Sequence, residues 1–299
     1  MKAPSSGHPH PQHAPRVAVI GAGYFGGLHA EKYATEDRAE LTAVVDTDTD
    51  RAREVADRHG VRALSDYRSL PGEVDAVSIA VPTAAHHEVA RFFLDNGVHV
   101  LVEKPFTTTI QEADDLIRRA RARGLVLQVG HLERFFCELC GLRRRVTTPL
   151  FIEALRIAPF KPRGVDVSVV LDLMIHDIDL ISALVGAPVA SVDAVGAPVL
   201  SAHEDIVNAR LAFENGCVAT ITTSRVAFKS ERRLRVFQPE GLLSIDLLKR
   251  RIASVRMVES DHGSRCSVEE QEFGEHDALR AEIRGFLDAV EHGTEPLVT

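Results

Sequence analysis

Five short apolar segments punctuate the first 130 residues, and each is nearly continuous instead of alternating with polar residues. This pattern is typical of strands covered on both faces, as in a parallel sheet. Helical stretches lie between them, and three of these end at a glycine, where a helix C-cap favours a positive φ. The predicted strands are 17–20, 41–45, 76–81, 98–102 and 125–129, and the predicted helices are 51–59, 86–96 and 110–123. Strands alternating with helices predict a doubly wound α/β domain of Rossmann type.

The pattern changes after Gly130. From position 189 to 273 it indicates mainly strands, and the pair Asn215-Gly216 predicts a hairpin, because Asn-Gly suits a type I′ turn. Strands joined by hairpins imply an antiparallel or mixed sheet. The other predicted elements are helices 133–145, 168–185 and 277–292 and a strand at 151–157. We therefore expect a second, α+β domain built on an open, mostly antiparallel sheet.

Length and charge narrow the class of protein. A chain of 299 residues suggests about two domains. We place them at 15–131 and at 132–299, after a flexible tail at 1–14. The net charge of -8 argues against nucleic acid as a partner. No apolar run is long enough to span a membrane and no signal peptide is recognisable, so we expect a cytoplasmic protein.

A glycine motif carries the first chemical signal. Gly21, Gly23 and Gly26 form G-x-G-x-x-G directly after a predicted strand and at the start of a helix, with Tyr24 and Phe25 between the last two. In this context the first glycine permits a tight turn, the second lets a pyrophosphate approach the backbone, and the third lets helix and strand pack closely. The helix N-terminus then supplies N–H groups for the phosphates.

Asp46 ends the second predicted strand, where an acid is expected to bind a ribose 2′-hydroxyl. Its carboxylate would repel a 2′-phosphate, so NAD is favoured over NADP. Arg51 and Arg53 follow in the next helix and leave NADP open. Cys137 and Cys140 form a lone C-x-x-C without a second pair, which argues against a structural zinc site, and we assign no metal.

Four motifs in order resemble the Gfo/Idh/MocA family of oxidoreductases. They cover the chain from Arg16 onward: the glycine motif continued by 28–30, the segment 81–86, the triplet Glu103-Lys104-Pro105, and a D-x-x-x-H-x-x-D pattern at 172–179. The resemblance implies a dinucleotide cofactor and a cis peptide bond at Pro105. The predicted cofactor-binding residues are Gly21, Gly23, Tyr24, Phe25, Gly26, Asp46, Pro82, His86, Glu103 and Lys104.

The same residues suit alcohol oxidation, which needs a base for the hydroxyl proton while hydride leaves. Histidine has a suitable pKa unperturbed, and a lysine acquires one when its surroundings lower its pKa. Asp172 and His176 are four residues apart and share a helix face, so the carboxylate can orient the imidazole. Lys104 ends a strand, where open α/β sheets bind ligands. We predict Lys104, Asp172 and His176 as catalytic residues, with support from Asp179.

The substrate is inferred from likeness. The segment 171–180 and the segments 204–211 and 223–226 resemble a branch of the family that oxidises UDP-N-acetylglucosamine at its 3-hydroxyl. A UDP-sugar carries two phosphates, which Arg134, Lys161, Arg163 and Arg225 could bind, although each could equally be a surface charge. Phe136-Cys137 stands where relatives are expected to have Asn-Pro, so the substrate contacts of that segment are open.

Three hypotheses remain: a nucleotide-sugar dehydrogenase, which we favour, a dehydrogenase of a free sugar or an inositol-like polyol, and a non-catalytic NAD-binding sensor. The triad of Lys104, Asp172 and His176 argues against the sensor, which needs no base. The predicted strand at 218–222 alternates small apolar and threonine side chains. Both of its faces could be buried, so we expect a homodimer or homotetramer. We accordingly assign dinucleotide binding to 15–131, and substrate binding and oligomerisation to 132–299.

Overall fold

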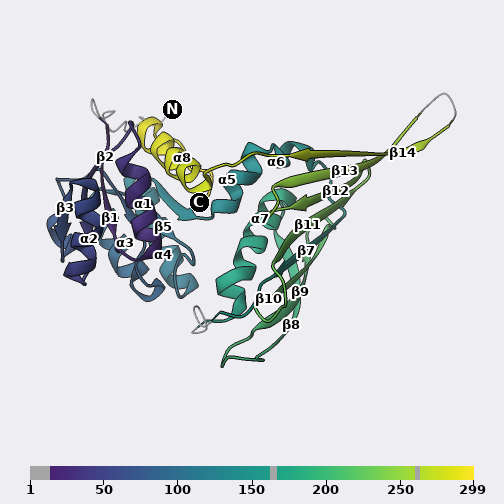
Figure 1. Cartoon of the computed structure of the whole chain (residues 1–299), viewed down its shortest axis with the longest axis horizontal. Coiled ribbons are helices and arrows are strands. Elements are labelled where there is room, and N and C mark those ends of the chain that lie inside the picture. The colour runs from purple at the N-terminus through teal and green to yellow at the C-terminus, as the bar shows by residue number, and fades with distance from the viewer. Residues whose placement is uncertain (1–13, 162–166, 260–262) are drawn as a thin grey trace, which may run out of the picture. The chain divides into compact units, whose positions relative to one another are not determined.

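The computed structural model describes residues 14–161, 167–259 and 263–299. Nearly all of the predicted tail, and Arg163, lie outside this range. The chain divides into two compact units (Figure 1). The first unit contains the residues up to Leu132 together with Asp277–Thr299, and the second unit is Glu133–His276. None of the described helices is long and apolar enough to cross a membrane.

The first unit is built on a parallel sheet of six strands, in the order β3-β2-β1-β4-β5-β6. This order is that of a doubly wound dinucleotide-binding fold and confirms the predicted fold class. Its strands are β1 (Arg16–Ile20), β2 (Glu40–Val45), β3 (Arg62–Leu64), β4 (Ala76–Ile79), β5 (His99–Glu103) and β6 (Leu127–Gly130). Strand β3 was not predicted, because this edge strand is too short to produce a hydrophobic pattern.

Helices α1 (Tyr24–Ala34), α2 (Thr49–His59), α3 (His86–Asp95) and α4 (Ile110–Arg123) connect these strands. Asp48 caps α2 by accepting two backbone N–H bonds, and Thr109 and Glu112 form a capping box on α4. Both helices end at glycines with left-handed backbone, as the sequence predicted.

The C-terminal helix α8 (Ala278–His292) belongs to the first unit. Its buried residues Leu279, Ile283 and Phe286 join the core that contains Val17 and Tyr33, and α8 lies beside α1 (Figure 1). This differs from the predicted boundary, which placed the helix with the second domain. The periodicity of an amphipathic helix predicts that one face is buried, but it does not indicate which domain covers that face.

The second unit contains an eight-stranded sheet in the order β14-β13-β12-β11-β7-β10-β9-β8. The neighbours β7 and β10 are parallel and the other neighbours are antiparallel, which confirms the predicted open, mostly antiparallel sheet. The strands are β7 (Phe151–Ile157), β8 (Val189–Ala197), β9 (Ile206–Phe213), β10 (Val218–Ser224), β11 (Glu231–Gln238), β12 (Gly241–Asp246), β13 (Arg251–Val258) and β14 (Arg265–Glu272).

The hairpin between β9 and β10 is present, but its turn differs from the prediction. A type I′ turn needs a positive φ at both central residues, and among the described residues other than glycine only Arg250 has one. Instead, Gly216 has φ +86° and donates its N–H to the carbonyl of Phe213 at 2.9 Å. Phe213 donates its own N–H to the carbonyl of Cys217, so the loop is Glu214–Gly216, one residue longer than a two-residue turn.

Two predicted helices of the second unit are also modified. The stretch 133–145 divides into α5 (Leu132–Leu139) and α6 (Leu142–Arg145) at Gly141, whose φ is +63°. The stretch 168–185 begins with a π-helical turn at Val170–Met174 and continues as α7 (Ile175–Val185), which ends at Gly186 as predicted. Helix α7 covers one face of the sheet (Figure 1), where Met174, Leu180 and Ile181 enter the core.

Candidate active site

Two glycines of the glycine loop in the first unit are required by close contacts with the main chain. Gly21 has φ +99°, and a Cβ there would lie 2.5 Å from the carbonyl oxygen of Ala80. A Cβ at Gly26 would lie 1.7 Å from the carbonyl oxygen of Gly21, so this glycine lets α1 pack against the loop. A Cβ at Gly23 would meet nothing within 4 Å. The protein itself does not require glycine at this position, as expected if an external ligand approaches there.

The N-terminus of α1 differs from those of α2 and α4. Its N-cap, Gly23, offers no side chain, and no acidic residue lies in the first turn. The N–H groups of that turn and the positive end of the helix dipole are therefore not neutralised by a cap. Tyr24 and Phe25, the first residues of the helix, are exposed. This loop fits the diphosphate of a dinucleotide.

Asp46, at the end of β2, is tied to the glycine loop. Its carboxylate accepts the N–H of Ala22 at 2.8 Å and that of Asp48 at 2.9 Å. Nη1 of Arg51 lies 3.6 Å from the same carboxylate, whereas Arg53 pairs with Asp50. Asp46 therefore lies beside the glycine loop with Arg51 near it, and its predicted bond to a ribose stays a prediction.

Lys104 immediately follows β5, and the bond between Lys104 and Pro105 is cis, as the resemblance implied. His86 connects this turn to the end of β4. Its Nδ1 lies 2.9 Å from the carbonyl oxygen of Pro105, and its Nε2 lies 2.8 Å from that of Val81, next to Pro82. His86 is 1% exposed, so it links two loops at the carboxyl end of the sheet. Its predicted contact with the cofactor stays a prediction.

In the second unit, Asp172 and His176 lie on one helical run. Asp172 lies in the π-helical turn and His176 in the first turn of α7, and both are half-buried. A π-helical turn widens the helix locally and is frequent at functional sites. Asp172 and His176 are therefore four residues apart on a helix that is not a regular α-helix at Asp172. This irregularity was not predicted from the sequence.

The predicted substrate cations have different surroundings. Arg134 donates to Asp179 at 3.1 Å, so the structure joins two residues that were predicted separately. Lys161 is exposed. Arg225 is 4% exposed, and its guanidinium bonds Asp205 at 2.7 Å. That pair stabilises the loop before β9, since Asp205 also accepts three backbone N–H bonds from 199–201. A role of any of them in binding substrate stays a prediction.

Arg156 is the main residue that the sequence analysis missed. It projects from the buried face of β7, is 2% exposed, and donates to both oxygens of Asp177 at 2.7 and 2.9 Å. It also bonds Glu133 of α5 at 2.9 Å. Asp177, which is not among the predicted site residues, is thereby buried next to His176 in the chain. The available signal was an arginine at an apolar position of an alternating strand.

This ion cluster sets the charge next to His176. Burial tends to raise the pKa of Glu133, but the positive charge of Arg156 and the hydrogen bonds that Arg156 donates lower it to about 2. Burial raises the pKa of Asp177, and the bonds from Arg156 offset this only in part. One guanidinium thus serves two acids and connects α5 and α7 to the sheet.

Comparison with known proteins identifies the relatives of this chain. Residues 15–131 match the model of an oxidoreductase family with an NAD-binding Rossmann fold, and residues 159–244 match the GFO/IDH/MocA C-terminal domain. The chain is 41% identical to a UDP-N-acetylglucosamine 3-dehydrogenase of Acidithiobacillus ferrooxidans, over 92% of this chain and 88% of the relative. It is 27% identical to a scyllo-inositol 2-dehydrogenase (NAD(+)) of Bacillus subtilis, over 96% and 90% of the two chains.

A solved structure of the Acidithiobacillus enzyme superposes with a TM-score of 0.88, at 39% identity, over 95% of this chain and 91% of that one. The matched regions include the glycine loop, Asp46 and Lys104 in the first unit, and Asp172 and His176 in the second. The chain belongs to the Gfo/Idh/MocA family of oxidoreductases, with an NAD-binding Rossmann domain.

Proposed function

We propose that this oxidoreductase oxidises a secondary hydroxyl of a sugar, the 3-hydroxyl of a UDP-N-acetylhexosamine, with NAD as hydride acceptor. The observation that carries the proposal is the similarity to the Acidithiobacillus 3-dehydrogenase, because it extends over 92% of this chain and therefore through both units. The uncapped N-terminus of α1 supports the dinucleotide, since it offers N–H groups to a diphosphate.

The position of Asp46 supports NAD over NADP. A carboxylate that accepts the N–H of Ala22 is fixed at the edge of the glycine loop, where it can bind the ribose 2′-hydroxyl and repel a 2′-phosphate. Asp46→Ala removes this acceptor and leaves Arg51 nearby. We expect weaker NAD binding and a narrower NAD-to-NADP preference in fluorescence titrations. Tighter binding of NADP than of NAD by the unmodified protein would contradict the assignment.

Lys104, His176 and Asp172 are the proposed catalytic residues. Lys104 or His176 takes the hydroxyl proton, and Asp172 orients the imidazole or balances its charge, while the bound NAD supplies an acceptor for hydride. Asp179, paired with Arg134, supports the same helix. Loss of a general base costs about 10²–10⁴ in rate. The glycine loop holds the cofactor phosphates, so these substitutions are expected to leave NAD affinity nearly unchanged.

The test combines substrates and variants. UDP-N-acetylglucosamine, other UDP-sugars, free sugars and inositols are supplied with NAD, and the absorbance of the reduced nicotinamide is followed. Lys104→Ala, His176→Ala and Asp172→Asn are compared with Lys249→Ala, which removes an exposed lysine outside the proposed site. We expect oxidation of UDP-sugars, large losses in the alanine variants and a smaller loss in Asp172→Asn. Normal single-turnover rates in both alanine variants would refute the catalytic assignment.

An inositol-type polyol is the second candidate substrate, favoured by the similarity to the Bacillus scyllo-inositol dehydrogenase over 96% of this chain. Turnover of inositols without turnover of UDP-sugars would select it. Binding of NAD without turnover of any substrate would favour a sensor.

We also propose that the second unit assembles a homodimer or homotetramer through the sheet face that α7 leaves uncovered. Along β10, Val218, Thr220 and Thr222 are half-buried on that face, whereas Ala219 and Ile221 enter the core. Light scattering at micromolar concentration tests this, and a monomer would refute it.

A further inference from the structure

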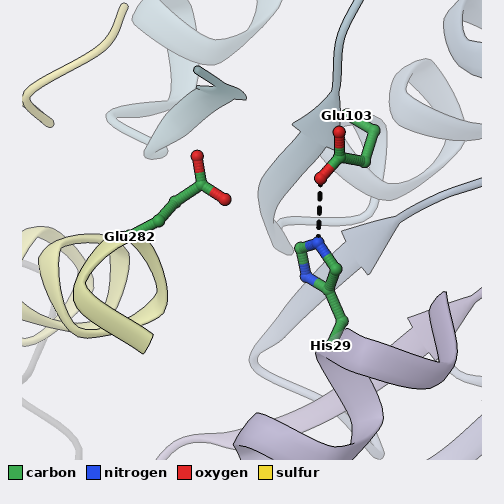
Figure 2. A group of neighbouring side chains, drawn as sticks. All are labelled: His29, Glu103 and Glu282. Atoms are coloured by element: carbon green, nitrogen blue, oxygen red, sulfur yellow. Dashed lines mark hydrogen bonds and ion pairs between the residues drawn. The ribbon is translucent and has the colours of Figure 1, made fainter. Parts of the chain in front are cut away.

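A cluster of three buried ionisable side chains lies next to Lys104 in the first unit (Figure 2). His29 comes from α1, Glu103 is the last residue of β5 and Glu282 comes from α8. They are 1%, 7% and 0% exposed, and one potential ligand atom from each lies within 4.8 Å of the others. The proposed catalytic chemistry uses neither His29 nor Glu282.

The carboxylate of Glu103 is confined from two sides. It accepts a hydrogen bond from Nε2 of His29 at 2.9 Å. On the other side lies Gly130, the partner of Glu103 in the pairing of β5 with β6. A Cβ at Gly130 would lie 3.1 Å from the carboxylate carbon and from one of its oxygens, which is tighter than ordinary contact. Gly130 therefore leaves just enough space for the Glu103 side chain.

Glu282 closes the third side. Its side chain points from α8 toward His29 and Glu103 (Figure 2). Its main-chain carbonyl oxygen accepts a hydrogen bond from the Gln128 side chain at 3.2 Å. Neither carboxylate oxygen of Glu282 has a hydrogen-bond partner among the described residues. An ionised carboxylate buried in this way is costly. Burial, followed by the negative charge of Glu103, raises the pKa of Glu282 well above its ordinary value and so favours its protonated form.

We propose that Glu103 is a positioning residue for Lys104, and that His29, Gly130 and Glu282 form a socket, the Glu103 socket, that holds it. This rests on the proposed function, since Lys104 is the residue to be positioned. Lys104 follows Glu103 directly in the chain, so fixing the Glu103 side chain fixes the backbone from which the lysine extends. A displacement of a reacting group by about 1 Å can cost about 10²-fold in rate. The helix α8 thus contributes to the site through Glu282 without supplying a reacting atom.

The first test is Gly130→Ala. Gly130 has no positive φ, so alanine can adopt its backbone while its Cβ displaces the Glu103 carboxylate. We expect kcat to fall about 10-fold with little change in the KM for NAD, and the pH profile of kcat to shift, because the surroundings of Lys104 change. Unchanged kcat together with an unchanged pH profile would overturn the socket.

The second test compares Glu282→Gln with Glu282→Leu. Glutamine has the size and neutrality of the protonated acid, so kcat should stay within about 3-fold, whereas leucine should reduce kcat by at least about 10-fold. The matched control is Glu36→Gln. Glu36 bonds Arg284 of α8 at 2.8 Å and lies just beyond α1, so its loss weakens the packing of α8 outside the socket. It should lower Tm while leaving kcat and its pH profile unchanged.

Two further measurements separate the possible failures. Lys104→Ala is assayed in parallel: if it turns over normally, the proposed function fails, and if it alone is inactive while the socket variants behave normally, the socket fails. The rate of acylation of Lys104, mapped by mass spectrometry, reports the environment of the lysine without turnover, and should change in Gly130→Ala and Glu282→Leu but not in Glu36→Gln.

A histidine and two carboxylates are also a donor set for zinc. If native mass spectra showed one equivalent of bound zinc that is lost in Glu282→Gln, the assignment of Glu282 as a protonated acid would be wrong.

Discussion

Each unit places a pair of buried or largely buried carboxylates next to residues that we propose for catalysis, and the two pairs are stabilised by different means. In the second unit, Arg156 lies between Glu133 and Asp177 and bonds both. In the first unit, Glu103 pairs with His29, and Glu282 faces them without a hydrogen-bond partner among the described residues. One pair is held by a fixed guanidinium, the other by an imidazole and a proton.

The difference shows that burial alone does not decide the state of an acid. The Glu133 side chain is 16% exposed and Glu282 is fully buried, yet the larger difference is in direction: the pKa of Glu133 falls to about 2 and that of Glu282 rises well above its ordinary value. Arg156 supplies a positive charge to Glu133, whereas the neighbour of Glu282 is another acid, Glu103. The contributions of Glu133 and Glu282 to stability should therefore respond to pH in opposite directions.

Replacement of Arg156 should have the largest effect on stability. Arg156→Met keeps much of the side-chain volume but leaves Glu133 and Asp177 buried without their common partner. Removing one member of a buried ion pair costs about 3–5 kcal/mol. Urea unfolding should show a lower midpoint with a similar slope. A loss below about 1 kcal/mol would show that water solvates these acids well enough without Arg156, and would contradict the contrast between the two units.

Acid should weaken the contribution of Glu133 to stability. The pKa of Glu133 is lower in the folded protein than in the unfolded chain, so its contribution is present above about pH 4.5 and is lost as pH falls toward 2. The slope reaches at most about 1.4 kcal/mol per pH unit. Glu133→Gln should flatten this acid limb in unfolding measured from pH 6 to pH 3. A variant with the slope of the unmodified protein would contradict the assignment.

The first cluster should respond in the reverse sense. The pKa of Glu282 is higher in the folded protein than in the unfolded chain, so stability falls as pH rises above about 4.5 toward the folded value. Glu282→Gln removes this titrating group. The stability of the variant relative to the unmodified protein should therefore increase between pH 5 and pH 8. Thermal unfolding over this range measures the gain. A constant difference across pH would show that Glu282 is ionised, and the contrast between the two units would be lost.

The smallest effect is expected at Arg232, which approaches Glu133 at 3.3 Å but is 45% exposed in its side chain. An exposed ion pair contributes about 0–1 kcal/mol. Arg232→Met should therefore change the unfolding midpoint only slightly, and added salt should remove the difference. A loss as large as that of Arg156→Met would show that the charge of the cluster does not reside mainly on Arg156.

Much of the first unit could be predicted because its signals are local. Near-continuous apolar runs predicted five strands of a parallel sheet, and the spacing of Gly21, Gly23 and Gly26 predicted the loop that Asp46 then joins. The glycines after α2 and α4 marked where those helices end. These features depend on the period of a strand or helix and on backbone sterics, which a short stretch of sequence determines by itself.

Other features were decided only by the tertiary structure. The sequence did not reveal the π-helical turn around Asp172, the membership of α8 in the first unit, or the meeting of Arg156 with Glu133 and Asp177. Nor could it reveal Glu282 facing Glu103, because residues on α8 and β5 are far apart in the chain. A local pattern specifies which face of an element must be buried. Which charges then share that buried space, and so whether an acid keeps its proton, depends on the packing of distant segments.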